Sequence, residues 1–66
     1  MNENQIKGEW NVMRGKVAEK WGKLTNDDLE VIKGQRTQLV GLLQQRYGKA
    51  QAAVEREVKE FEISVS

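Results

Sequence analysis

Apolar residues recur every three or four positions along most of the chain. The first such stripe runs over residues 10–24 and consists of Trp10, Met13, Val17, Trp21 and Leu24. Residues at this spacing lie on one face of an α-helix, because the helix repeats every 3.6 residues. Gly22 follows the last aromatic residue of the stripe and suits a left-handed C-terminal cap. Proline is absent, and no alternating run is long enough to favour a strand, so the pattern predicts an all-α fold.

The second predicted helix is short and begins with a capping box. Thr25 is expected to be its N-cap, and Asp28, three residues later, its capping-box partner. Asp27 and Asp28 both lie in the first turn, where the helix dipole favours negative charge. The helix should span about residues 26–33 and end at Gly34. Its buried residues should be Leu29 and Ile32.

Two further helices complete the pattern. The third should cover about residues 35–47, with Gly48 closing it, and its stripe consists of Arg36, Leu39, Val40, Leu43 and Tyr47. The fourth should cover about residues 50–62, with Ala50, Ala53, Val54, Val58 and Phe61 on one face. A partial turn around Ile6 is expected before the first helix. The residues after 62 are expected to fray, because little there can pack.

The glycines indicate an internal repeat. Gly8, Gly15 and Gly22 recur 26 positions later as Gly34, Gly41 and Gly48. The same offset relates five further pairs: Met13 and Leu39, Val17 and Leu43, Lys20 and Arg46, Trp21 and Tyr47, and Lys23 and Lys49. The repeat predicts two helical hairpins that pack face to face with pseudo-twofold symmetry and share one core. We therefore expect a small bundle of four helices in a single domain over residues 1–66, ordered over about 5–62.

Composition narrows the function classes. The 66 residues carry 11 Lys and Arg against 10 Asp and Glu, a net charge of +1, which argues against a dedicated polyanion binder. Cysteine and histidine are absent, so the commonest metal ligands and the commonest general base are missing. No stretch approaches a membrane span, and residues 1–8 have no apolar signal core. These features predict a cytoplasmic protein without a metal or another cofactor.

Two glycines lie in the middle of predicted helices, on the side away from the core stripe. Gly15 and Gly41 each cost about 1 kcal/mol relative to alanine. They could provide a close-approach surface for a partner helix, or contact the chain's own termini or neighbouring hairpin, and the second interpretation is favoured. The aromatic residues all fall on core stripes, so packing is favoured over base stacking. They are Trp10, Trp21, Tyr47 and Phe61.

Two groups of charged residues bear on binding and on packing. Five cations lie in the first 24 residues (Lys7, Arg14, Lys16, Lys20 and Lys23), and a solvated helix face is favoured over a weak anion-binding strip. Glu57 falls inside the apolar stripe of the fourth helix. It could accept a hydrogen bond from a Trp or Tyr side chain or pair with Arg36 or Arg46. The preferred interpretation is that Glu57 lies at the edge of the stripe and reaches water.

Catalytic residues are not predicted. Asp27 and Asp28 are adjacent and point in different directions, so they cannot form a pair in a cleft. The acidic residues of the fourth helix lack the spacing of a calcium loop and are expected to form a solvated surface. These are Glu55, Glu57, Glu60 and Glu62. Ser64 and Ser66 have no base nearby. We therefore predict a protein that is not an enzyme.

Three segments resemble a known family. GKVAEKWGKLTNDD (residues 15–28), QLVGLLQQRYG (38–48) and AAVEREVKEFE (52–62) are similar to the CsbD-like family of small bacterial general-stress proteins. The resemblance implies a cytoplasmic stress protein with a SAM-domain-like arrangement of two crossed hairpins. The family has no established catalytic or ligand residues, so the resemblance assigns none to this chain. Leu42 departs from the lysine expected there and could form a self-association surface or be simply one more exposed leucine. Ala18 and Asn26 depart from a typical Lys and Asp.

Three functions follow as hypotheses. The leading one is a folded general-stress protein that binds another macromolecule, as a monomer or with weak self-association. The second is a hydrophilic protectant against water loss, which the mean hydropathy of −0.73 would suit. The third is a small nucleic-acid-associated protein that uses the lysines of the first helix, for which binding should weaken steeply with salt.

Overall fold

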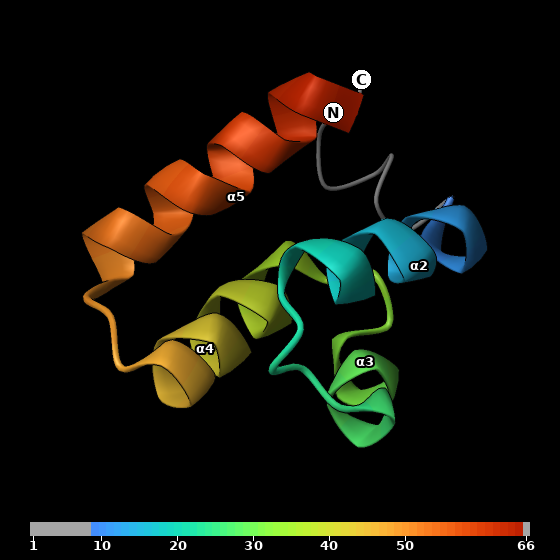
Figure 1. Ribbon diagram of the computed structural model, residues 1–66, viewed down its shortest axis with the longest axis horizontal. Helices are drawn as coiled ribbons and strands as arrows, with labels where there is room; N and C mark the ends of the chain where they lie inside the picture. The colour runs from blue at the N-terminus through green and yellow to red at the C-terminus, as the bar shows by residue number, and fades with distance from the viewer. Residues whose placement is uncertain (1–8, 66) are drawn as a thin grey trace.

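The computed structural model describes residues 9–65, and these form four helices and no strand (Figure 1). They are α2 (Trp10–Lys20), α3 (Asn26–Ile32), α4 (Arg36–Tyr47) and α5 (Gln51–Val65). The predicted all-α class and the positions of the helices are confirmed, with most ends within two residues of the expected ones. The expected turn around Ile6 lies outside the described residues.

The capping box that opens α3 is present as predicted. The Asp28 backbone N–H donates to Thr25 Oγ1 at 3.1 Å, and the Thr25 backbone N–H donates to Asp28 Oδ2 at 3.0 Å. Two N–H groups at the start of the helix are thereby satisfied by side chains. This reciprocal pair fixes where α3 begins, after the loop that follows α2.

The C-terminal caps agree with the prediction for two helices and differ for one. Gly48 closes α4 in the left-handed region at φ 64°, and α3 ends through Lys33 and Gly34 at φ 43° and 83°. The prediction for Gly22 is wrong. The chain leaves α2 at Trp21, which has φ −120° and whose N–H still donates to the Val17 carbonyl. Because this turn needs no positive φ, Gly22 is not required as a left-handed cap.

One hydrophobic core lies between the helices. Twelve apolar residues among residues 9–65 are buried, and they include every predicted stripe residue that is fully apolar except Trp10, Ala50 and Ala53. They are Met13, Val17, Trp21, Leu24, Leu29, Ile32, Leu39, Val40, Leu43, Val54, Val58 and Phe61. Trp10 and Tyr47 are half-buried and pack against this core, while Ala50 and Ala53 are exposed. The aromatic residues therefore serve the core, as predicted.

The C-terminal end of the chain differs from the expectation. Residues after 62 continue α5 as far as Val65 and do not fray. Val65 packs against the core, and the Ser64 hydroxyl donates to the Phe61 carbonyl at 2.8 Å. Glu62 is buried and accepts a hydrogen bond from Arg36 Nε at 3.1 Å. These contacts anchor the last turn, and the sequence pattern alone gave no sign of them.

Helix α4 lies at the centre of the arrangement and packs against both α3 and α5 (Figure 1). The offset of 26 residues places α2 in register with α4 and α3 in register with the first part of α5. Gly22 and Gly48 are equivalent in the repeat, but only Gly48 has the left-handed conformation. The chain therefore leaves α2 and α4 in different ways. The pseudo-twofold packing and the SAM-domain-like arrangement stay predictions.

Candidate interaction surfaces

An ion pair with two hydrogen bonds joins α3 to the end of α4. Arg46 donates from Nε to Asp28 Oδ2 at 3.0 Å and from Nη2 to Asp28 Oδ1 at 2.7 Å. Asp28 is buried, whereas Asp27 is exposed. The two hydrogen bonds from Arg46, together with the Thr25 N–H, lower the pKa of Asp28 from 3.8 to about 2. Every oxygen of this carboxylate is engaged in holding the fold, so Asp28 is not available for catalysis.

Glu57 lies at the edge of the core, as the preferred interpretation held, and it also has partners. Lys49 Nζ donates to its Oε2 at 2.8 Å, and the Trp21 indole N–H lies 3.5 Å from its Oε1. The Lys49 hydrogen bond, opposed by partial burial and reinforced by the indole, lowers the pKa of Glu57. The prediction that an indole could donate to Glu57 is confirmed by Trp21. The two predicted cationic partners, Arg36 and Arg46, bind other carboxylates, and the sequence did not predict Lys49 as the cationic partner of Glu57.

The acidic residues of α5 do not form a common site. Glu57 binds Lys49, Glu62 binds Arg36, and Glu55 accepts a 3.4 Å hydrogen bond from the Gln51 side chain. Across residues 9–65 no group of three carboxylates is arranged to hold a metal ion. None of the described helices combines the length and the apolar character needed to cross a membrane.

The two mid-helix glycines face open space. A methyl group added to Gly15 or to Gly41 would meet no described atom within 4 Å. The favoured interpretation, that these glycines contact another part of the chain, is therefore wrong for residues 9–65. Because a helix gains stability when such a glycine becomes alanine, the glycines are not explained by the packing of the described chain.

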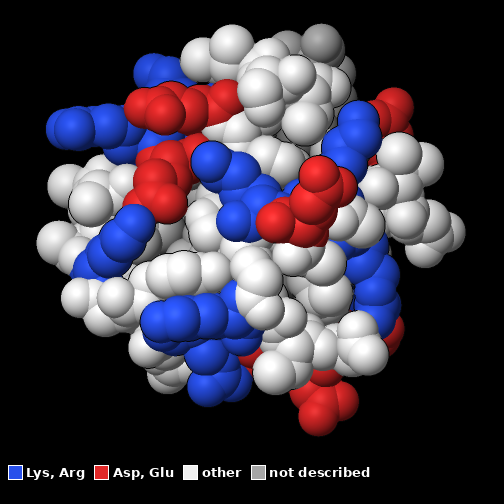
Figure 2. All heavy atoms as spheres, viewed as in Figure 1, with Lys and Arg blue, Asp and Glu red and all other residues white. Residues whose placement is uncertain are grey.

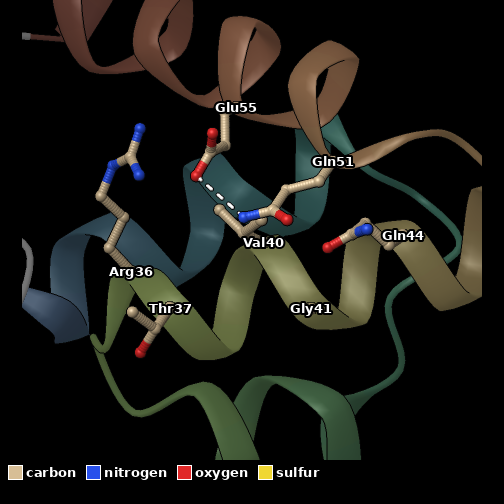
Figure 3. Close-up of a pocket in the computed structure, with 7 residues that line it drawn as sticks. All are labelled: Arg36, Thr37, Val40, Gly41, Gln44, Gln51 and Glu55. Atoms are coloured by element: carbon tan, nitrogen blue, oxygen red, sulfur yellow. Dashed lines mark hydrogen bonds between the residues drawn. The ribbon is translucent and has the colours of Figure 1, made fainter.

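Gly41 also lines a pocket of about 180 Å³ between α4 and α5 (Figure 3). Thr37 and Gln44 extend from α4, Gln51 and Glu55 from α5, and buried Val40 lies between the two helices. The walls thus offer a hydroxyl, two amides and a carboxylate beside a small apolar area, while Arg36 lines one end. Such groups can both donate and accept hydrogen bonds with a polypeptide backbone.

Leu42 broadens the apolar face of α4, and a self-association surface at this residue stays a prediction. The residue is half-buried and packs against the core from α4. Among the described residues, the large apolar side chains that are most exposed lie on three different helices. They are Val12 on α2, Val31 on α3 and Ile63 on α5. A monomer with at most weak self-association stays a prediction.

Comparison with known proteins places the chain in a family. The CsbD-like family profile matches residues 4–56. A UPF0337 protein of Pectobacterium atrosepticum is 55% identical over 94% of this chain and 90% of its own length. A UPF0337 protein of Protochlamydia amoebophila is 52% identical over 94% of both chains, and UPF0337 protein YjbJ of Escherichia coli K12 is 48% identical over 94% of this chain and 90% of its own.

The names of these relatives state no reaction, substrate or partner. No solved structure matches the chain. The sequence segments that first indicated the family, the family profile and the three relatives agree over almost the whole length. The chain therefore belongs to the CsbD-like family.

Proposed function

We propose that this protein is a non-enzymatic general-stress protein of the cytoplasm that binds another macromolecule through the pocket between α4 and α5. The single observation that carries the proposal is Gly41. It lies in the middle of a helix, costs that helix about 1 kcal/mol relative to alanine, and opens onto a pocket that no described side chain fills. A glycine at this position would allow the backbone of a partner to approach α4 closely, which explains why a residue that destabilises the helix is present.

The chemistry of the pocket supports a polypeptide as the partner. Thr37, Gln44, Gln51 and Glu55 supply donors and acceptors over a small apolar floor. Polar groups of this kind fix orientation when they surround a limited apolar contact. The buried core supports a folded module over an unfolded protectant, because a site of fixed geometry needs a specified fold.

The glycine itself provides the test. Gly41→Leu should stabilise the protein by about 0.5–1 kcal/mol in urea unfolding, because leucine is a far better helix former. The same side chain would fill the pocket and block the partner. Gly15→Leu is the matched control, since it makes the same exchange in the middle of α2, also in open space. It should give a similar gain in stability.

Binding is measured by photo-crosslinking in stressed bacterial cells. A benzophenone amino acid is placed at Thr37 on the pocket wall or, as a control, at exposed Glu60 of α5. We expect a discrete adduct from position 37 that persists with Gly15→Leu and is lost with Gly41→Leu. An adduct that survives Gly41→Leu, or the absence of any adduct from position 37, would contradict the proposal. Loss of stability cannot explain the expected result, because the variant is more stable.

A further inference from the structure

The fold brings together two copies of one short motif. Residues 20–23 read KWGK and residues 46–49 read RYGK. The second copy begins 26 residues after the first, which is the offset of the repeat. The first copy lies where α2 ends and the second where α4 ends. We call the area that they form the KWGK–RYGK surface. On the face seen in Figure 2, acidic and basic side chains are interspersed, and one group of basic side chains lies at the lower left, where Figure 1 shows α4.

Tyr47 joins the two copies. The Lys23 backbone N–H donates to the Tyr47 hydroxyl at 3.2 Å. The ammonium groups of Lys23 and Lys49 lie 5.1 Å and 5.8 Å from the centre of the Tyr47 ring. Lys20 lies in the same way 5.8 Å from the centre of the Trp21 ring. Each lysine is thus held beside an aromatic ring, in the range of a cation–π interaction.

The surface carries more positive than negative charge. Arg46 is neutralised by Asp28 and Lys49 by Glu57. Lys20 and Lys23 make no ion pair within 4 Å among the described residues, although Lys20 acts on Glu57 from a longer distance. Lys16 lies one helical turn before Lys20 on the same side of α2 and is exposed. Three lysine ammonium groups are therefore available to an anionic partner, in a chain whose overall charge is only +1.

The chemistry of the available groups distinguishes between anionic partners. The planar guanidinium of Arg46, which would recognise a carboxylate with two hydrogen bonds, is already occupied by Asp28. What is left are lysine ammonium groups, which act as point charges and suit phosphates. We propose that the KWGK–RYGK surface, with Lys16, binds the phosphate backbone of a nucleic acid. This site does not depend on the pocket beside Gly41.

Burial of the rings defines the kind of binding. Trp21 is only 3% exposed, and Tyr47 is half-buried and flanked by two lysines, so neither ring offers a free face for base stacking. Binding is therefore independent of sequence and weak at physiological salt. The same burial argues against a membrane surface, because a peripheral membrane site places aromatic or aliphatic side chains in the interface beside its cations.

The test is the salt dependence of binding to a labelled DNA duplex of mixed sequence, measured by fluorescence anisotropy. Three phosphate contacts predict a slope of log K against log salt of about −2.7, or a loss of about 40-fold in affinity between 50 and 200 mM salt. The double variant Lys20→Gln, Lys23→Gln should reduce the slope to about −0.9 and the loss to about fourfold. The variant should stay folded at the assay temperature, since both side chains are exposed and an exposed cation–π contact contributes only weakly to stability.

The matched control is the double variant Lys33→Gln, Lys59→Gln. It removes the same charge from two exposed lysines that have no contact with the KWGK–RYGK surface among the described interactions. It should keep the wild-type slope. No binding at low salt, an equal loss in both double variants, or stronger binding to vesicles that contain an anionic lipid would each overturn the proposal. The crosslinking result at position 37 is independent of all three outcomes.

Discussion

Replacing Leu43 by alanine is expected to lower the midpoint of urea unfolding substantially. Leu43 is 1% exposed and belongs to the hydrophobic core on α4, the helix that packs against both α3 and α5. Truncation of a fully buried leucine costs about 2–5 kcal/mol, because apolar contacts are lost and a cavity is left behind. A domain of this size has about 3–10 kcal/mol of stability in total. The one substitution thus removes a large share of it.

The neighbouring residue offers a matched control. Leu42→Ala removes the same atoms one position earlier, from a side chain that is only half-buried. It should cost about 1 kcal/mol or less, in proportion to the smaller apolar area that it buries. Urea unfolding, followed by tryptophan fluorescence, measures both variants. Equal costs at the two positions would contradict the core described above.

Acid is expected to destabilise the protein through Asp28. The pKa of Asp28 is about 2 in the folded chain and 3.8 in the unfolded chain. The folded state therefore binds a proton on the Asp28 carboxylate less readily. The stabilisation from this carboxylate is complete above about pH 4 and is lost as the pH falls to about 2. The pKa values of Glu30 and Glu57 are lowered as well, by Arg14 and by Lys49, and their contributions are lost in the same direction.

The variant Asp28→Asn isolates the contribution of Asp28. It keeps a side chain that can accept from the Thr25 N–H but removes the charge that Arg46 binds. We expect a clear loss of stability at neutral pH and a shallower decline between about pH 4 and 2. Asp27→Asn, in the same helical turn but exposed, should change little. Urea midpoints across this pH range give the comparison, and parallel declines for wild type and Asp28→Asn would contradict it.

Local features were predictable because they depend on neighbours in sequence. The capping box at Thr25 and Asp28 needs only a spacing of three residues, and Gly48 only the end of a stripe. The stripes identified most core residues for the same reason. The prediction of a left-handed cap at Gly22 was wrong, because a glycine after a helix permits such a cap without requiring one. At this position the turn through Trp21 removes the need.

Contacts between distant residues were not predictable. Arg46 was considered as a partner of Glu57, but it binds Asp28, which is 18 positions away, while Arg36 binds Glu62 across 26. Several carboxylates could each pair with either arginine, and only the packing of α3, α4 and α5 decides which pairs form. The extension of α5 to Val65 depends on the same tertiary contacts. The pocket beside Gly41 combines residues of two helices, so the sequence indicated its glycine and not its walls.

The central claim is that the chain folds cooperatively into a specified helical module, in contrast to a hydrophilic protectant that stays barely folded. A thermal melt by circular dichroism, repeated over about a hundredfold range of protein concentration, tests it most directly. We expect a single sigmoidal loss of helix with a midpoint that does not depend on concentration, as for a folded monomer. A gradual, featureless loss of helix would contradict the packed core and favour the protectant.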